Sequence, residues 1–155
     1  MSKSIGAAIG KIASGLYVAT AKLNDVPIGM LCSFVEQAGF EPPMVSIALG
    51  SGRPIVAALE GDGLFGLHVL SKDDNALLKA FARGDNPAAF EELARVENAF
   101  GIPQFSEAWA FLACKVVGKL DAGDHTLYLA EVLDGALQRE SAEPMVRVRA
   151  NGFAY

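Results

Sequence analysis

Two long β-type runs joined by a short polar turn constrain the fold of this chain more than any other feature. Residues 110–120 and 126–137 carry the apolar side chains that strands favour, and residues 121–124 (Asp-Ala-Gly-Asp) connect them. A short connection rich in Asp and Gly is typical of a turn between antiparallel strands. The pair therefore predicts antiparallel pairing in a mainly β domain.

Shorter β-type runs occupy much of the remaining chain. A turn at residues 23–25 predicts a hairpin between its two neighbours, and Pro42 and Pro43 must interrupt any ladder because proline has no N–H to donate. The β-type run that follows these prolines ends at the two glycines on either side of Ser51. Strands are predicted for residues 16–21, 28–35, 44–49 and 64–70, with 144–149 as a final edge candidate.

Short helices are predicted between some of these strands. Residues 4–12 place Ile5, Ala8, Ile9 and Ile12 on one helical face, which predicts a short helix that docks by that face. Proline suits the first turn of a helix, so residues 54–60 and 87–94 are predicted helices. A further helix carries Leu77, Leu78 and Phe81; Asp73, Asp74 or Asn75 caps it, and Gly84 ends it.

This pattern predicts one antiparallel barrel with flanking helices. Five or six strands joined mostly by hairpin-length turns, without regular strand-helix-strand alternation, favour a barrel over a doubly wound parallel sheet. The helices then lie outside the barrel or cap it. The chain shows no internal repeat and no linker, so residues 1–155 are predicted to form a single domain.

Composition narrows the classes of partner. The formal net charge of −5 argues against a protein that binds nucleic acid through its phosphate backbone. Apolar and aromatic residues make up 52% of the chain before its 16 glycines are counted, whereas an average domain has about 45–50% with glycine included. No run reaches the roughly 18 to 20 apolar residues of a membrane span. We therefore expect a subunit interface to bury the excess of apolar residues.

Two further expectations come from sequence motifs that the chain lacks. The two cysteines, Cys32 and Cys114, lie far apart in apolar runs, and no Cys or His spacing suits a metal site. No metal is therefore expected. The first residues lack the basic and long apolar segments of a secretory signal, which predicts a cytoplasmic location.

Three loops are candidates for a ligand site: residues 30–34, 50–54 and 123–125. The loop from Gly50 to Pro54 combines two glycines, a hydroxyl and Arg53, which suits a phosphate but equally suits a simple turn with a solvated arginine. Arg83 is a second phosphate candidate, although a cation near a helix C-terminus also matches the helix dipole. The sequence alone leaves both alternatives open.

The two histidines have different expected roles. Gly123 and Asp124 precede His125 at the start of a strand, where an imidazole can lie at the rim of a barrel, or where the three residues can form an ordinary turn. His68 stands between Leu67 and Val69, which favours a histidine buried in the core or at an interface.

Several segments together resemble a known family. They follow one another in the family's order and spacing, and they cover nearly the whole chain: residues 10–21, 29–38 and 40–43, then Arg53, residues 65–70, Phe81, and residues 112–114 and 123–125. The series resembles the flavin reductase-like family of FMN-binding split barrels. It is most similar to the flavin reductase domain at the C-terminus of cyanobacterial-type flavodiiron proteins.

The resemblance implies a homodimer of Greek-key split barrels with FMN bound noncovalently near the interface. It also implies hydride transfer from NADH or NADPH to the flavin, and it allows an electron-acceptor protein as a partner. In such an enzyme the flavin carries the two-electron chemistry, so few catalytic side chains are expected.

The resemblance also assigns site residues. Met30, Leu31, Cys32, Ser33 and Phe34 are expected along the flavin, with Ala48, Leu49, Gly50 and Ser51 continuing that wall. Arg53 is expected to bind the phosphate, with Phe81 and Arg83 as further cofactor contacts, and His125 to lie on the nicotinamide side. The chain departs from the family pattern at Leu31 and Cys32, where many members have hydroxyl residues, at His68, where many have Asn, and at Arg147 and Arg149, where aromatic residues or His are frequent.

Two other functions remain compatible with the sequence. One is a flavin-binding electron carrier that has no productive nicotinamide site, because split barrels also host carriers. The other is a ligand-free scaffold or interaction domain. A flavin absorbance spectrum of the purified protein distinguishes the scaffold, and consumption of NAD(P)H distinguishes the carrier.

Overall fold

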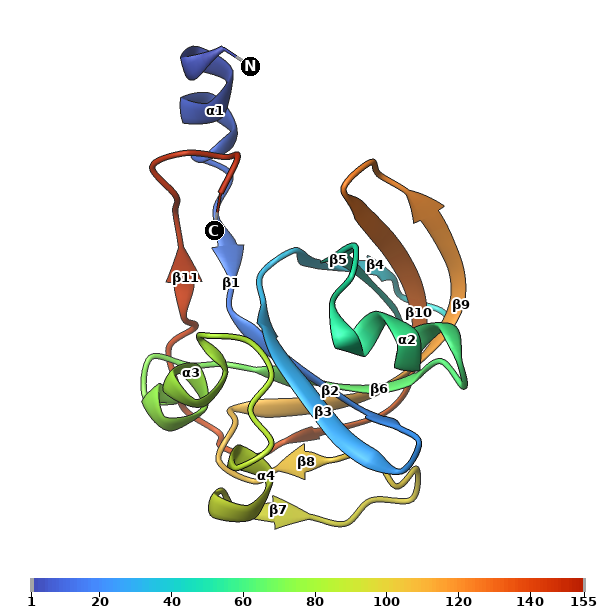
Figure 1. Ribbon diagram of the computed structural model, residues 1–155. Coiled ribbons are helices and arrows are strands. Elements are labelled where there is room, and N and C mark those ends of the chain that lie inside the picture. The colour runs from blue at the N-terminus through green and yellow to red at the C-terminus, as the bar shows by residue number, and fades with distance from the viewer. Residues whose placement is uncertain (1, 155) are drawn as a thin grey trace.

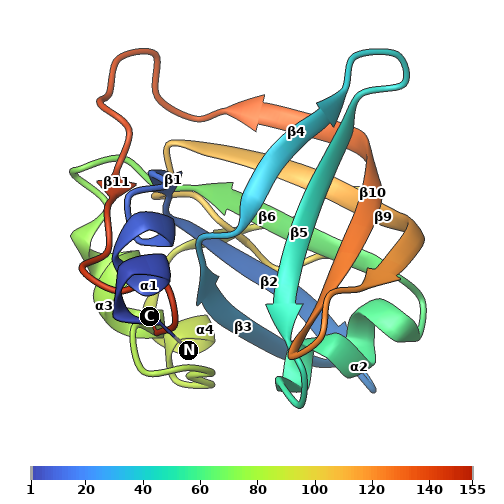
Figure 2. The same ribbon diagram turned by 90° about the horizontal axis from the view of Figure 1, so that it is seen from above.

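A single antiparallel sheet of seven strands forms the body of the computed structural model, which describes residues 2–154. The strands are β2 (Tyr17–Leu23), β3 (Val26–Cys32), β4 (Val35–Gly39), β5 (Met44–Gly50), β6 (Leu64–Val69), β9 (Ala110–Asp121) and β10 (His125–Leu137). Their spatial order is β3-β2-β6-β9-β10-β5-β4. Figures 1 and 2 show the sheet curving round on itself from β3 to β4. The predicted antiparallel barrel is therefore confirmed.

Four short helices and two small strand pairs surround the barrel. The helices are α1 (Lys3–Ile9), α2 (Pro54–Glu60), α3 (Asn75–Phe81) and α4 (Ala89–Glu92). The pairs are β1 (Ser14–Gly15) with β11 (Val146–Arg147), and β7 (Arg95–Val96) with β8 (Gln104–Phe105). Helix α2 packs against β2, β3 and β6 and buries Ile55, Ala58 and Leu59. No helix within residues 2–154 has the length and apolar character needed to span a membrane.

The hairpins agree with local backbone chemistry. Asn24 and Asp25 both have positive φ (50° and 65°) between the paired residues Leu23 and Val26. Positive φ at both central residues is the signature of the tight turn whose twist matches that of antiparallel strands. The long predicted pair is β9 and β10, and its register shifts after Leu129 and again after Val132. Such bulges bend a strand, which helps this pair to follow the curvature of the barrel.

Two large hydrophobic clusters and a smaller one, formed by Ile102, Phe111 and Ala113, stabilise the domain. Ile47, Leu49, Phe65, Leu67 and Tyr128 lie inside the barrel with exposed fractions of 1% or less. The second cluster lies beneath α3 and α4, and its aromatic members are Phe81, Phe90 and Phe105. The rings of Phe90 and Phe105 stack with centroids 5.3 Å apart. The second cluster fixes α3 against the barrel beside β2 and β3.

The structure corrects the predicted strand at residues 28–35. This run divides into β3 and β4, because residues 33 and 34 lie between two strands that pair with different partners: β3 pairs with β2, and β4 with β5. The apolar pattern continues through the break, since both strands bury side chains in the same barrel. Local sequence therefore gives no sign of the division.

The structure also corrects the first helix and the segments near it. Helix α1 ends at Ile9, where Gly10 N–H donates to Gly6 O and Lys11 N–H donates to Ala8 O, both at 3.0 Å. The expected docking face is not covered by the barrel, since Ile5 and Ile12 are 53% and 67% exposed. Strands β1, β7 and β8 were not predicted, because two-residue strands have no periodicity to recognise.

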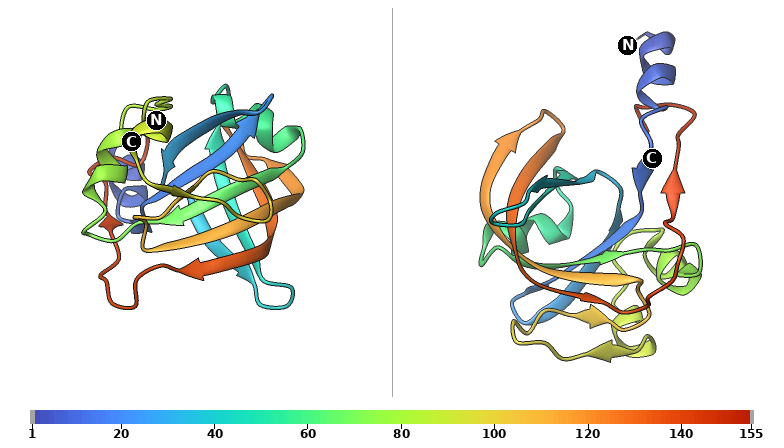
Figure 3. Two further views of the ribbon diagram at one scale, coloured as in Figure 1. Left: turned by 90° about the horizontal axis from the view of Figure 1, so that it is seen from below. Right: turned by 180° about the vertical axis from the view of Figure 1, so that it is seen from behind.

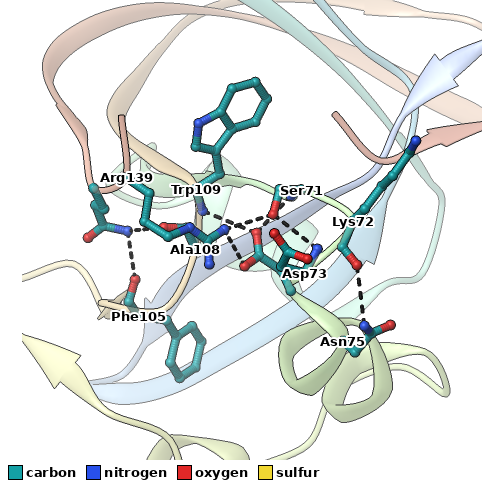
Figure 4. A network of polar contacts seen from close by, with 10 residues as sticks. Ser71, Lys72, Asp73, Asn75, Phe105, Ala108, Trp109 and Arg139 are labelled. Carbon is teal, nitrogen blue, oxygen red and sulfur yellow. Dashed lines mark hydrogen bonds and ion pairs between the residues drawn. The ribbon is translucent and has the colours of Figure 1, made fainter. Parts of the chain in front are cut away.

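A buried carboxylate anchors the chain where it returns from β10. Asp74 Oδ2 accepts hydrogen bonds from the backbone N–H groups of Ser71 (2.7 Å) and Trp109 (3.2 Å), and Oδ1 accepts one from Arg139 Nη2 (2.6 Å). Arg139 also donates to Ser71 Oγ at 2.8 Å. Figure 4 shows how these contacts join three separate stretches of chain. The side chain of Asp74 is only 1% exposed, so these partners replace the water that the carboxylate loses.

His68 is a fully buried part of the core, as the sequence favours. Its Nδ1 lies 3.0 Å from the carbonyl oxygen of Val18, and its Nε2 accepts the N–H of Phe105 at 3.0 Å. This pair of contacts suits the neutral ring with its proton on Nδ1. Burial lowers the pKa of His68 to about 4, against the weaker opposing effect of the Val18 hydrogen bond.

We expect the pKa of His68 to make folding pH-dependent between about 4 and 6.5. In that window the ring takes a proton only in the unfolded chain, so lowering the pH favours unfolding, by up to about 3 kcal/mol over the full range. Denaturant unfolding of the wild type and of His68→Asn at pH 7, 6, 5 and 4 measures the effect. The variant should lack this component of the pH dependence, and identical pH profiles for the two proteins would contradict the assignment.

Candidate functional site

The candidate site lies where the chain passes from one edge of the sheet to the other. Cys32 ends β3, Val35 begins β4, and only Ser33 and Phe34 separate them. The carbonyl of Phe34 accepts the N–H of Ala48 at 2.9 Å, which fastens the crossing to β5. Ser33 and Phe34 therefore lie at the split between the two edges of the barrel.

A pocket of about 300 Å³, which we call the arginine pocket, opens on one side of this crossing. It brings together predicted residues from three segments: the end of β3 and the crossing, the residue before α2, and the end of α3 with the loop after it. These residues are Met30, Leu31, Cys32, Ser33, Arg53, Phe81 and Arg83. Leu16 and Arg147 also line it. The sequence had identified Arg147 only as a departure from the family pattern, because nothing local connects β11 with the end of β3.

Three arginines line the arginine pocket. Arg53 precedes α2, Arg83 follows α3, and Arg147 belongs to β11. No Asp or Glu lines the pocket, and none of the ion pairs formed within residues 2–154 involves these three arginines. A cavity with three unpaired cations attracts an anion, and guanidinium groups match phosphate oxygens well.

Two contacts hold Arg83 near the strand that forms the floor of the pocket. Asp85 Oδ1 accepts the N–H of Gly29 at 2.9 Å, which ties the loop after α3 to β3. Gly29 also lets α3 approach closely, because a Cβ there would lie 2.8 Å from the ring of Phe81. Phe81 itself is 1% exposed and contributes mainly to the core, with one edge on the pocket.

His125 lies on the other side of the crossing. Its Nδ1 is 2.8 Å from Asp124 Oδ1, and its ring centroid is 5.6 Å from that of Phe34. The hydrogen bond and charge of His125 hold the pKa of the Asp124 carboxyl below its usual range. Phe34, His125, Arg149 and the turn at residues 152–154 border a second pocket of about 500 Å³, which we call the histidine pocket. Arg149 lies over the Phe34 ring at 4.9 Å from its centroid.

Gly50 lies between a residue of each pocket, Arg53 and His125. It pairs with His125 across β5 and β10, and a Cβ on Gly50 would lie 3.7 Å from His125 Nε2 and 4.0 Å from Arg53 Nε. The missing side chain thus leaves open the space between the guanidinium and the imidazole. Ser51 reinforces the pairing, since its N–H donates to the carbonyl of Asp124 at 2.9 Å.

The remaining predicted residues have more limited roles. The side chain of Leu49 is 1% exposed and belongs to the core, so only its backbone can face a ligand. Ala48 lines a third hollow of about 320 Å³ together with Phe34 and residues of the N-terminal segment. Burial raises the pKa of Cys32 to about 12, so its thiol stays protonated. Within residues 2–154, no cluster of three or more His, Cys, Asp or Glu side chains is suited to holding a metal ion.

Comparison with known proteins identifies relatives of the chain over almost its full length. A model of the flavin reductase-like domain family matches residues 9–152. A diflavin flavoprotein of Nostoc sp. is 34% identical over 160 residues, which cover 99% of this chain and 28% of that protein. The chain therefore spans little more than a quarter of the length of this curated relative.

Solved structures show the same architecture. The flavin reductase of styrene monooxygenase (SMOB) from Pseudomonas putida S12 superposes with a TM-score of 0.78 at 26% identity and covers 93% of this chain and 91% of its own. The NADH:FAD oxidoreductase SgcE6 of Streptomyces globisporus has a TM-score of 0.81 at 24% identity, with coverage of 92% and 80%. At that identity the second likeness concerns the fold alone.

Proposed function

The chain belongs to the flavin reductase-like domain family, and on this premise we propose that it binds FMN and reduces it with a hydride taken from NADH or NADPH. The observation that carries the proposal is the pairing of an arginine pocket with a histidine pocket across Gly50. The name of SMOB, a flavin reductase, supports it.

The arginine pocket is the proposed seat of the flavin. Arg53 would bind the phosphate with Arg83 nearby, and the backbone of residues 30–34 with the Ser33 hydroxyl would contact the ribityl chain or the ring edge. The chain's part is to position the cofactor and exclude water, and the bound flavin supplies the two-electron chemistry. Leu31 and Cys32 bring no hydroxyl, so backbone groups must provide most polar contacts along this strand.

The histidine pocket is the proposed nicotinamide side. Asp124 accepts from Nδ1 of His125, and Nε2 of the ring lies 3.7 Å from where a Cβ on Gly50 would be. A ring held in one orientation there can position a dinucleotide without transferring hydride itself. His125 thus acts in the proposal by orienting the donor.

A carrier without a productive nicotinamide site is the second candidate. The turn at residues 152–154 forms part of the wall of the histidine pocket, and the side chain of His125 is only 18% exposed, which favours a site that a dinucleotide does not reach. The two candidates are separated by adding NADH or NADPH anaerobically to flavin-loaded protein and following the flavin absorbance. Bleaching supports the reductase, whereas a spectrum that only dithionite changes supports the carrier. An electron-acceptor protein is a proposed partner in either case.

We further propose that the protein is a homodimer. An arm composed of α1, β1, β11 and residues 148–154 projects from the barrel, as Figures 1 and 3 show. The arm is held together from within, since Gly152 N–H donates to Gly6 O and Arg149 N–H donates to Gly10 O. Its apolar side chains are nevertheless open to water: Ile5, Ile12, Val146, Val148 and Phe153 are 41% to 67% exposed.

We expect the arm to mediate dimer formation, because a second copy would remove these side chains from water. Light scattering of flavin-loaded protein should give twice the 16.3 kDa of one chain. Ile12→Asp with Val148→Asp should shift the mass toward one chain, whereas Val117→Asp, an equally exposed position on β9, should leave it unchanged. A wild type that stays at the mass of one chain would refute the proposal.

Arg53→Ala should weaken FMN binding about tenfold and riboflavin binding less than threefold. A charge-assisted hydrogen bond to phosphate contributes about 1.5–3 kcal/mol, and the lower figure suits an exposed arginine. Quenching of flavin fluorescence measures both dissociation constants. Arg95→Ala on β7, outside the arginine pocket, is the matched control. Equal weakening of the two ligands would mean that Arg53 does not bind the phosphate.

His125→Ala should slow the reduction of bound flavin by NADH while leaving FMN affinity unchanged. Stopped-flow absorbance across NADH concentrations measures the rate, and FMN titration provides the control for binding. If His125 and Asp124 form only a structural turn, the substitution costs about 1 kcal/mol of stability and the rate stays at the wild-type value. That second result would remove His125 from the nicotinamide site.

A further inference from the structure

Among residues 2–154, Arg149 is the only lysine or arginine that lines the histidine pocket. Its guanidinium lies 4.9 Å from the centre of the Phe34 ring, and the imidazole of His125 lies 5.6 Å from the same centre. The pocket has one acidic side chain, Asp124, which contacts His125. Since no ion pair within the described part of the chain involves Arg149, its charge has no carboxylate partner there.

Contacts within the chain fix the position of Arg149 before any ligand binds. Its N–H donates to Gly10 O at 2.9 Å, and Gly10 permits this approach because a Cβ there would lie 2.6 Å from Arg149 O. At the far end of the side chain, Nη1 donates to the carbonyls of Gly152 and Ala154, both at 3.4 Å. These bonds are long and come from one of the two terminal nitrogens. The guanidinium is therefore preorganised for a ligand, which lowers the entropy cost of binding.

The proposed dimer is compatible with an accessible Arg149. The exposed side chains of Val146 and Val148 alternate with those of Arg147 and Arg149, which are partly buried against the two pockets. In an extended segment, alternate side chains point to opposite sides. A second copy that covers the two valines would therefore contact the side of the arm opposite Arg149.

We propose that Arg149 binds the diphosphate that joins the two nucleosides of the nicotinamide donor. This inference rests on the proposed nicotinamide side, the histidine pocket. Only one ribose separates the nicotinamide ring from the diphosphate, so a cation for the diphosphate has to lie close to the group that orients the ring. Arg149 meets this condition, because it and His125 lie against the same Phe34 ring. Its guanidinium also offers the paired donors that phosphoryl oxygens accept.

The 2′-phosphate of NADPH is a less suitable ligand for Arg149. It is attached to the adenosine ribose, beyond the diphosphate, and is therefore farther from the nicotinamide along the molecule. A cation that shares the Phe34 ring with His125 is close to the nicotinamide end of the donor. Because NADH and NADPH have the same diphosphate, Arg149 should strengthen the binding of both donors equally.

The first test measures binding without turnover in the wild type, Arg149→Gln, Arg149→Lys and Lys11→Gln. Calorimetric titration of FMN-loaded protein with NAD⁺ and NADP⁺ should give dissociation constants about tenfold higher in Arg149→Gln for both nucleotides. Arg149→Lys keeps the charge but loses the paired donors, so its loss should be smaller. Lys11 is an exposed cation between α1 and β1 that lines none of the three pockets, so Lys11→Gln should match the wild type.

Steady-state reduction of FMN gives a second measurement. In Arg149→Gln the KM for NADH and for NADPH should rise about tenfold with kcat unchanged, because the diphosphate takes no part in hydride transfer. Reduced nicotinamide riboside has the same ring and no phosphate, so the variant and the wild type should use it with equal kcat/KM. The riboside is the control for a structural role, since a distorted histidine pocket would slow its reaction as well.

Three results would overturn the inference: an equal loss of kcat/KM for the riboside and the dinucleotides, weakened binding of NADP⁺ alone, or unchanged binding of both dinucleotides. The first would mean that Arg149 acts through the shape of the pocket, and the second would assign it to the 2′-phosphate. Weakened binding of both dinucleotides in a protein whose flavin no donor reduces would support the role of Arg149 and overturn only the proposed reductase activity. A wild type that binds neither dinucleotide would overturn both.

Discussion

The two-residue crossing at Ser33 and Phe34 is the constraint on which the rest of this structure depends. The strands that it joins, β3 and β4, form opposite edges of a seven-stranded sheet. Each extended residue spans only about 3.3–3.6 Å, so a short crossing requires the two edges to lie close together. The sheet therefore has to curl into a barrel, and the crossing itself becomes the border of the candidate site, with Ser33 on the arginine pocket and Phe34 on the histidine pocket.

The arginines of this chain divide by whether the fold itself supplies a partner. Arg139 has one, the buried carboxylate of Asp74, and the pair holds the returning C-terminal segment to the barrel. Arg53, Arg83 and Arg147 converge on one cavity without such a partner among residues 2–154. Like charges brought together in a cavity repel one another, so the arrangement is most stable with an anion bound. This contrast separates a structural role from a binding role within one residue type.

Buried polar groups help to position the site residues without contacting them. His68 bonds to Val18 and Phe105, and so joins β6 to β2 and β8. Asp74 joins the loops before α3 and β9 to Arg139. Since burying a polar group without partners is costly, these contacts favour one arrangement of the loops over others. The position of Arg147 depends on that arrangement, although neither His68 nor Asp74 lines the arginine pocket.

The sequence alone determined the antiparallel barrel, the helix at residues 54–60 and the long pair β9 and β10. It also predicted that His68 is buried, because its neighbours in the sequence are apolar. Each of these depends on local periodicity or turn chemistry. It also indicated Arg53, Arg83 and His125, because a cation or an imidazole close to a glycine and to the end of a helix or strand is visible locally. Tertiary structure decided the division of β3 from β4, the pairing of β1 with β11, the exposed face of α1 and the convergence of Arg147 with Arg53. These features arise from contacts between residues far apart in the chain, and no local pattern of side chains specifies which distant segments meet.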